Sequence, residues 1–97
     1  MGTTIENVVL ACREKDAAAL NALLTTPAAG ADIEALFALG RDVVLKGQTP
    51  TITDGEASVV VELEIQRETG SERVQRTWAL ARGTDGLWRL TALPDCY

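Results

Sequence analysis

The sequence predicts an α+β fold in which N-terminal helices pack on one face of a four-stranded antiparallel meander. From Asp42 to Leu93, apolar and polar residues alternate, which is the period of strands with one buried face. Glycine-containing dipeptides interrupt this alternation and indicate hairpin turns at Asp54-Gly55, Thr69-Gly70 and Asp85-Gly86. Before residue 42, apolar residues recur at helical spacing instead. We therefore expect one domain over residues 1–97, with helices in about 4–40 and the sheet in about 42–93.

The first predicted helix covers residues 4–15, because its apolar residues form a single stripe at helical spacing. Thr3 or Thr4 would cap its N-terminus. If this helix continued to residue 24, Asp16 would lie on the buried stripe, where an unpaired carboxylate is costly. We therefore predict that the helix breaks and that Asp16 caps a second helix over residues 17–24.

A loop that contains Pro27 separates the second helix from a third, which we predict over residues 33–39. Asp32 would cap this third helix. Gly40 would adopt the left-handed conformation that commonly ends a helix. The inward side of the helix would carry Ile33, Leu36 and Phe37.

The four predicted strands cover residues 42–53, 56–67, 72–82 and 87–93. We expect the first strand to bend or bulge near Gly47-Gln48 and Pro50. Because proline cannot donate to a ladder, Pro50 would lie at an edge, at a bulge or facing away from a partner. The second strand would direct its apolar residues toward the helices, namely Val59, Val61, Leu63 and Ile65. On the third strand Arg76 shares an apolar face with Val74, Trp78 and Leu80. Residues 94–97 would form a short tail.

Composition argues against several classes of function. The 97-residue chain has a formal net charge of −5 and no basic cluster, unlike a nucleic-acid-binding domain. It has no His, so it lacks the base of Ser-His and Cys-His nucleophiles and the commonest metal ligand. No apolar stretch approaches the roughly 20 residues that span a bilayer. The sequence therefore predicts no catalytic motif, no metal, no cofactor, and neither a nucleic-acid nor a membrane partner.

The first residues determine the expected compartment. Met1-Gly2-Thr3-Thr4 lacks the basic segment and apolar core of a signal peptide, so a native Met1 predicts a cytoplasmic protein. If Met1-Gly2 replaces a removed leader, the protein is expected to be extracytoplasmic instead.

The two cysteines, Cys12 and Cys96, lie near opposite ends of the sequence. The interpretation that we prefer is a buried, free Cys12 on the first helix and an exposed, free Cys96 on the tail. Nothing in the sequence marks the oxidising compartment that a disulfide requires. The alternative is a disulfide between them, which would close a long loop and stabilise the fold.

Two segments resemble those of nuclear transport factor two-like domains, which have the cystatin-like fold. The first runs from the opening helix through the alanine-rich residues 17–24 to Gly30-Ala31-Asp32-Ile33. The second is the closing hairpin, in which Trp78-Ala79-Leu80 is followed by Asp85-Gly86-Leu87-Trp88-Arg89-Leu90. This resemblance covers nearly the whole chain and implies a cone, in which a curved sheet wraps a helix and leaves a pocket at the open end.

The resemblance implies two kinds of function. Some members are isomerase-, dehydratase- or cyclase-like enzymes, and others only bind or associate, often as dimers through the exposed sheet face. The enzymes usually carry an extra strand and loop between the second and third helices, where this chain has only residues 25–31. No inward Tyr or Asp on the first helix matches the isomerases, since Tyr97 is terminal. No catalytic residue can therefore be carried over onto a position of this chain.

Three residues form the candidate ligand-binding site: Arg76, Trp78 and Asp42. In one interpretation Arg76 anchors a carboxylate ligand beside Trp78 at the mouth of the pocket. In the interpretation that we prefer, Arg76 reaches solvent and covers Trp78 with its aliphatic stem. Asp42 would either point into the cone or serve as a turn residue at the start of a strand.

The first functional hypothesis is a non-catalytic binding or association domain that holds a small apolar or anionic ligand in the cone. An alternative is an isomerase-, dehydratase- or cyclase-like enzyme with Asp42 as the base and Arg76 as its electrostatic partner. A further alternative is a domain that only binds other proteins. A flat, weakly charged sheet face predicts a homodimer, and it consists of Val60, Thr77, Ala79 and Ala81.

Overall fold

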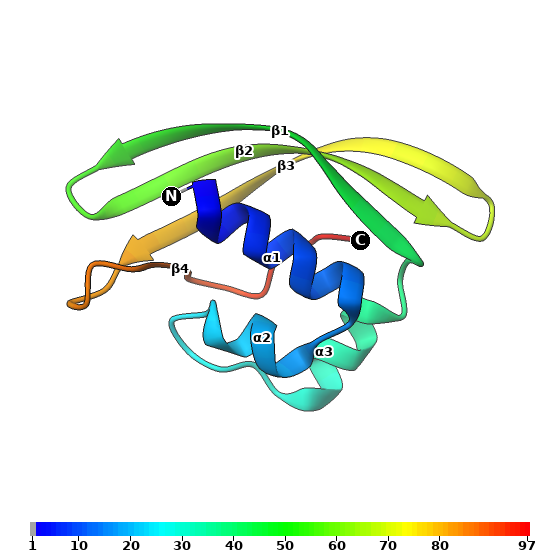
Figure 1. The fold of residues 1–97 in the computed structure, drawn as a ribbon, viewed down its shortest axis with the longest axis horizontal. Helices are drawn as coiled ribbons and strands as arrows, with labels where there is room; N and C mark the ends of the chain where they lie inside the picture. The colour runs from blue at the N-terminus through cyan, green and yellow to red at the C-terminus, as the bar shows by residue number, and fades with distance from the viewer. Residues whose placement is uncertain (1) are drawn as a thin grey trace.

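The chain forms helices first and a sheet second, as predicted (Figure 1). The computed structural model describes residues 2–97, so the predictions about Met1 lie outside the described residues. The elements are α1 (Gly2–Glu14), α2 (Ala17–Ala22), α3 (Gly30–Phe37), β1 (Asp42–Thr53), β2 (Glu56–Arg67), β3 (Gly70–Arg82) and β4 (Trp88–Leu90). The strands pair in the order β1-β2-β3-β4, each antiparallel to the next, which confirms the predicted meander. Within residues 2–97, no helix has the length and apolar character needed to cross a membrane.

α1 ends at a residue with left-handed backbone geometry, Lys15, whose φ is 55°. The N–H of Asp16 donates to the carbonyl of Ala11 at 2.9 Å, and the N–H of Lys15 donates to that of Cys12 at 3.2 Å. These two bonds are the Schellman pattern, which satisfies carbonyls that the helix leaves without partners. The carboxylate of Asp16 then accepts from the N–H of Ala19 at 3.1 Å. The predicted break and the predicted cap of α2 are therefore confirmed.

Two other predicted caps are wrong. Thr3 and Thr4 lie inside the first turn of α1, and the Thr4 hydroxyl donates to the carbonyl of Trp88 at 3.2 Å. α3 begins earlier than predicted, after Ala29, which makes no side-chain cap. Asp32 consequently lies in the first turn of α3, where its carboxylate still faces the positive end of the helix dipole.

The prediction of a left-handed Gly40 is also wrong. Among the glycines of residues 2–97, positive φ occurs only in the hairpin turns, at Gly55, Gly70 and Gly86. Asp54 has a φ of 48°, so Asp54-Gly55 has the two positive φ angles that a tight hairpin turn requires. Gly40 is constrained for a different reason, because a side chain there would overlap the ring of Tyr97.

β1 carries a bulge that changes which of its residues face the helices. The register of β1 against β2 shifts after Leu45, so that Lys46 is an extra residue. Before the shift Leu45 lies opposite Leu63, and after it Pro50 lies opposite Val59. The bulge lies near Gly47, as predicted. Pro50 lies on an edge strand, which is one of the placements expected for it, because β1 is the first strand of the sheet.

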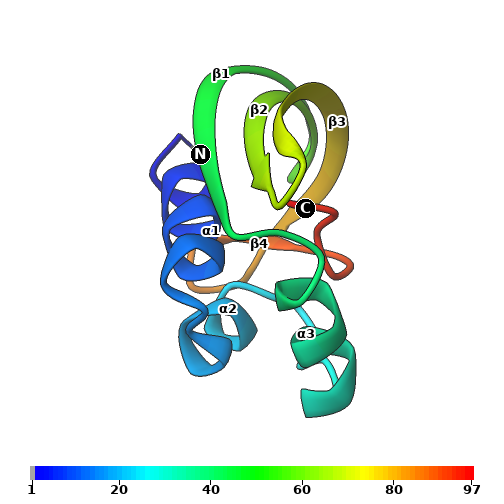
Figure 2. The same ribbon diagram turned by 90° about the vertical axis from the view of Figure 1, so that its right-hand side faces the viewer.

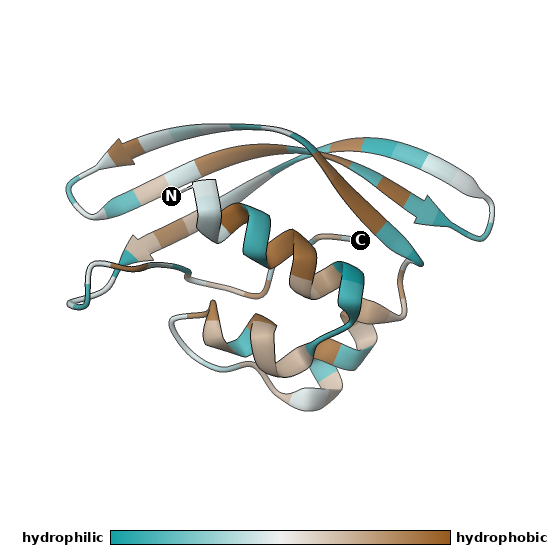
Figure 3. Cartoon of the chain, in the orientation of Figure 1, coloured by the Kyte–Doolittle hydropathy of each residue, from teal (hydrophilic) through white to brown (hydrophobic). Residues whose placement is uncertain are grey.

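The core lies between α1 and the inward face of the curled sheet (Figure 2). The predicted inward residues of β2 all have 0% of their surface exposed: Val59, Val61, Leu63 and Ile65. α1 contributes three residues that are equally buried, which are Ile5, Val8 and Cys12. Figure 3 shows these apolar stretches in brown on α1 and on the strands above it. The predicted inward face of β2 is therefore confirmed.

β4 is shorter than predicted, and three residues near the end of the chain that follows it are buried, namely Pro94, Cys96 and Tyr97. The N–H of Leu90 donates to the carbonyl of Leu23 at 2.8 Å, and the N–H of Thr25 donates back to Leu90 at 2.8 Å, so the α2–α3 loop covers the outer edge of β4. After Leu90 the chain turns beneath the sheet and ends beside α1 (Figure 1). The prediction of an exposed tail is wrong, because Cys96 is 0% exposed and Tyr97 is 4% exposed.

Candidate functional site

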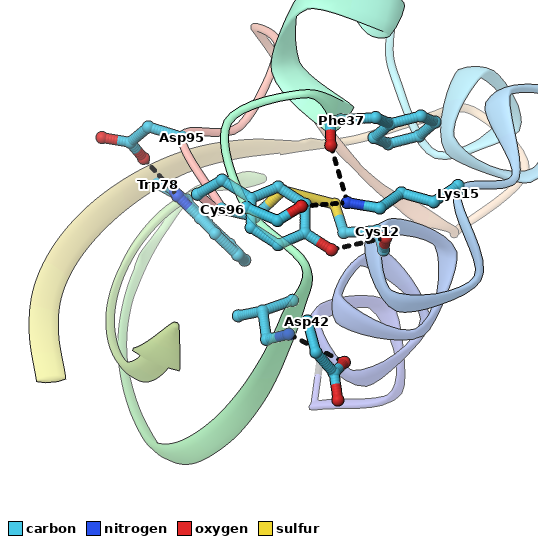
Figure 4. Close-up of a disulfide and its surroundings, with 10 residues drawn as sticks. Cys12, Lys15, Phe37, Asp42, Trp78, Asp95 and Cys96 are labelled. Atoms are coloured by element: carbon cyan, nitrogen blue, oxygen red, sulfur yellow. Dashed lines mark hydrogen bonds between the residues drawn. A yellow bond between two sulfur atoms is a disulfide. The ribbon is translucent and has the colours of Figure 1, made fainter. Parts of the chain in front are cut away.

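Two of the three candidate site residues, Arg76 and Trp78, lie on β3 and share one carboxylate. The indole N–H of Trp78 donates to Oδ1 of Asp95 at 2.7 Å, as Figure 4 shows. Nε of Arg76 lies 3.6 Å from Oδ2 of the same residue. Trp78 itself is buried in the core. Asp95, from the segment after β4, therefore ties that segment to both predicted residues.

The contact between Arg76 and Asp95 bears on both interpretations of Arg76. The side chain of Arg76 is about one third exposed, while its Nε atom is buried and makes no hydrogen bond within residues 2–97. A carboxylate therefore does lie beside Arg76, but the chain itself supplies it. An anionic ligand at the Nε edge of Arg76 would therefore compete with Asp95.

Asp42 lies elsewhere, at the start of β1. Its Oδ1 accepts from Nε of Arg13 at 3.1 Å and from the N–H of Val43 at 2.8 Å, and its side chain is 42% exposed. Asp42 lies opposite Gln66 of β2, whereas Arg76 lies opposite Val61. That offset of five residues corresponds to about 16 Å along the strand. Asp42 and Arg76 therefore do not converge, and the base and partner that the enzyme hypothesis requires are not brought together.

A disulfide joins Cys12 of α1 to Cys96 of the tail across 84 positions of sequence (Figure 4). Both cysteines have 0% of their surface exposed. The preferred interpretation of two free thiols, with Cys96 at the surface, is therefore wrong, and the alternative of a disulfide is correct. Sequence reasoning failed here because a tail without periodicity gives no information on where it packs.

Lys15, which directly follows α1, contacts the tail and was not identified from the sequence. Its Nζ donates to the carbonyl of Phe37 at 2.7 Å and to that of Gly40 at 2.6 Å, at the C-terminal end of α3 (Figure 4). The same Nζ lies 3.9 Å from the centroid of the Tyr97 ring, within the range of a cation–π interaction. Desolvation lowers the pKa of Lys15 below its ordinary value, and the nearby carboxylate of Asp42 opposes this shift.

Tyr97 was likewise not identified from the sequence. Its hydroxyl donates to the carbonyl of Cys12 at 2.7 Å, in the last turn of α1 where carbonyls lack helical partners. Burial raises the pKa of Tyr97 to about 12; the negative charge of Asp42 contributes to this rise and the positive charge of Arg13 opposes it. The phenol is therefore a proton donor under all ordinary conditions.

These residues form one unit, which we call the tail anchor: Cys12, Lys15, Gly40, Cys96 and Tyr97. The tail anchor fills the interior of the cone at the end where α1 stops and β1 begins. Two hollows formed by residues 2–97 lie elsewhere. One of about 340 Å³ lies between residues 77–79 and 90–95, and another of about 430 Å³ lies beside Leu10. Neither is lined by the inward residues of β2.

Metal chemistry finds no support in the arrangement of acidic and sulfur-containing residues. Within residues 2–97, no three His, Cys, Asp or Glu side chains gather closely enough to hold a metal ion.

One signal for the tail anchor was present in the sequence, since Tyr97 directly follows Cys96. Had the disulfide been assumed, Tyr97 would have been expected beside α1.

Comparisons with known proteins support the fold and no more. No protein-family model matches the chain, and no curated protein matches it. A solved structure of a designed nuclear transport factor two-like protein, Rd1NTF2_05 with five substitutions, is similar with a TM-score of 0.71. The match covers 92% of this chain and 90% of the designed chain at 13% sequence identity. The chain therefore has the nuclear transport factor two-like α+β fold, with N-terminal helices on a four-stranded meander.

Proposed function

We propose that this domain is a non-catalytic association module that pairs with a second copy of itself through the outer face of its sheet. The observation that carries the proposal is the filled interior of the cone. Tyr97 and the disulfide occupy the space in which a small apolar or anionic ligand would lie. With that space taken, the outer surface is the part of the molecule left for binding.

The outer face consists of residues that alternate with the buried ones on β1, β2 and β3. One row contains Thr49, Val60 and Thr77, and the next contains Thr51, Ser58 and Ala79. We use "outer face" for these six residues. All are exposed except Val60, which is half-buried, and none carries a charge. Ala81, which was also predicted on this face, is half-buried in the following row.

The size and charge of the outer face suit a second copy. The outer face is the uncharged part of the outward side of β1, β2 and β3, and that whole side covers roughly 570 Å² in projection for three strands of about 12 residues. Each partner buries roughly 800 Å² of accessible surface in a standard interface. Beyond the outer face, on the same side of the sheet, Glu64 lies opposite Arg73 and 3.4 Å from Nζ of Lys46. These contacts offset negative charge that would otherwise repel a second copy of an acidic chain.

The alternatives have less support. A ligand in the cone would have to displace Tyr97, and the enzyme hypothesis would require Asp42 and Arg76 to meet, whereas each has another partner. A domain that binds a different protein would use the same outer face, so the experiment below distinguishes it from self-association.

We further propose that the protein works in an oxidising compartment outside the cytoplasm. The support is the buried Cys12–Cys96 disulfide, because structural disulfides persist in such compartments and are rare in the cytosol. This favours the extracytoplasmic alternative over the cytoplasmic one.

Sedimentation equilibrium of the oxidised protein tests the self-association. We expect a dimer at concentrations above about 10 μM, which corresponds to an association free energy of about −7 kcal/mol. The Ala79→Lys variant places a charge in the outer face and should sediment as a monomer, because burying unpaired cations against each other is costly.

Ala35→Lys is the matched control, since Ala35 is an exposed alanine on α3, away from the sheet. It should leave the dimer intact. A monomeric wild-type protein at these concentrations, or a dimer that tolerates Ala79→Lys as well as Ala35→Lys, would show that the outer face does not mediate self-association.

A further inference from the structure

We propose that the end of the cone where α1 stops and β1 begins is a binding site for a phenol, which the chain fills with its own Tyr97 for as long as the Cys12–Cys96 disulfide is intact. Nothing in the self-association of the outer face requires this site, so the two proposals stand or fall separately.

Three different contacts surround the Tyr97 side chain. The hydroxyl donates to the Cys12 carbonyl at 2.7 Å, and the Lys15 ammonium lies 3.9 Å from the ring centroid. Gly40 packs so closely against the ring that even a methyl group there would overlap it. A hydrogen-bond acceptor, a cation over the ring and a flat backbone surface together select a planar aromatic ring with one hydroxyl group.

The three contacting groups do not depend on the tail for their positions. Cys12 lies in the last turn of α1, and Gly40 lies in the connection from α3 to β1. Lys15 is held by the carbonyls of Phe37 and Gly40, at 2.7 and 2.6 Å. These groups therefore stay in place when the ring leaves, which makes the site largely preformed.

The chemistry of the site also defines what it should reject. A carboxylate in place of the hydroxyl would face the Cys12 carbonyl, and two acceptors repel each other. A ring without a hydroxyl would leave that carbonyl without its donor, which costs binding free energy. The site is therefore expected to prefer phenol to benzene and to benzoate.

The disulfide controls access to the site. Tyr97 is the residue next to Cys96, so while Cys96 is bonded to Cys12 its ring stays close to the site and refills it as an intramolecular ligand. A dithiol reductant removes this restraint: one of its thiolates attacks a protein sulfur to form a mixed disulfide, and its second thiolate displaces the protein thiolate. The products are two protein thiols and the oxidised, cyclic form of the reductant. The tail is then held by Asp95, through Trp78 and Arg76, and by the contacts of Tyr97 itself, which a free phenol can replace.

Replacement of the missing ring by free phenol tests the site directly. Tyr97→Ala removes the ring and hydroxyl but keeps the disulfide, so phenol supplies the deleted atoms. At phenol concentrations about ten times the dissociation constant, the melting temperature of oxidised Tyr97→Ala should rise by about 5–10 °C. Benzene at the same concentration should raise it less, and phenol should not raise that of the oxidised wild type. No rise in the variant, or an equal rise in both proteins, overturns the proposal.

A second measurement uses the wild-type protein and does not depend on the folding of a variant. In a buffer of fixed dithiothreitol composition, the fraction of reduced protein is read by alkylation of Cys12 and Cys96. Phenol that binds only the reduced form should raise the ratio of reduced to oxidised protein by up to about tenfold, and benzoate should not raise it. An unchanged ratio in phenol, or an equal increase in benzoate, overturns the proposal.

Discussion

At the scale of single residues, Lys15 explains how a polar group is tolerated at the end of the cone. Its left-handed backbone would be less strained with glycine, but glycine has no side chain to contact α3. The Lys15 ammonium satisfies two carbonyls, of Phe37 and Gly40, and covers the ring of Tyr97. The phenol of Tyr97 beneath it is buried, and this burial raises its pKa, so that the phenol keeps its proton.

The ionisation of Tyr97 gives a direct test of this environment, because Tyr97 is the only tyrosine in the chain. We expect its phenolate absorbance to titrate with a pKa of about 12 in the native protein and near the ordinary value of about 10 in denaturant. The folded protein thus holds this proton at pH values where the unfolded chain has lost it. The resulting stabilisation is complete below about pH 10 and is lost as pH rises toward about 12.

Comparison with Tyr97→Phe isolates this effect from other groups that titrate in the same range, including Lys15. The free energy of unfolding of the wild type, relative to Tyr97→Phe, should fall by about 1.4 kcal/mol between pH 9 and 11. A native pKa near 10, or a difference that does not change with pH, would contradict the burial of the phenol.

At the scale of elements, the first two strands were predictable, whereas the starts of α1 and α3 were not. Alternation and glycine turns are local signals, so the bounds of residues 42–53 and 56–67 agree with β1 and β2. A helix start depends on which of several candidate residues caps it. Asp16 was identified because the buried stripe excluded it from a continuous helix. No such conflict existed for Thr4 or Asp32, and both lie inside their helices.

The two aspartates allow a matched test of what a cap contributes. Asp16→Ala removes the side chain that accepts from the N–H of Ala19 and should lower the free energy of unfolding by about 1 kcal/mol. Asp32→Ala removes only a favourable interaction with the dipole of α3 and should cost about 0.3 kcal/mol. Urea denaturation of both variants measures the difference. Equal losses would mean that the Asp16 hydrogen bond does not stabilise α2.

At the scale of the whole molecule, the disulfide connects the first helix to the last residues and closes nearly the entire chain into a loop. This long-range link decides where the tail lies, which is why the tail and the candidate site could not be predicted from the sequence. Arg76 and Trp78 were identified from the pattern of β3 alone. Their partner Asp95 comes from residues 94–97, which have no pattern to place them.

Reduction should therefore weaken the whole fold and not only the tail. Closing a loop across 84 positions reduces the conformational entropy of the unfolded chain, and the loss on reduction should be about 4–5 kcal/mol. Guanidinium denaturation with and without dithiothreitol measures it. The double variant Cys12→Ala/Cys96→Ala should match the reduced wild type in either buffer. A reduced protein as stable as the oxidised one would show that the bond does not contribute to stability.

The bulge at Lys46 has a consequence for how the surface of this protein can change. Strand residues point alternately to the two sides, and Lys46 is the extra residue at which β1 departs from this alternation against β2. Loss of the Lys46 codon alone would remove the bulge and place Gly47 directly after Leu45, still opposite Glu62, so that Thr49 and Thr51 stay on the outer side. A single in-frame deletion at this position would thus straighten the edge strand without exchanging its two sides.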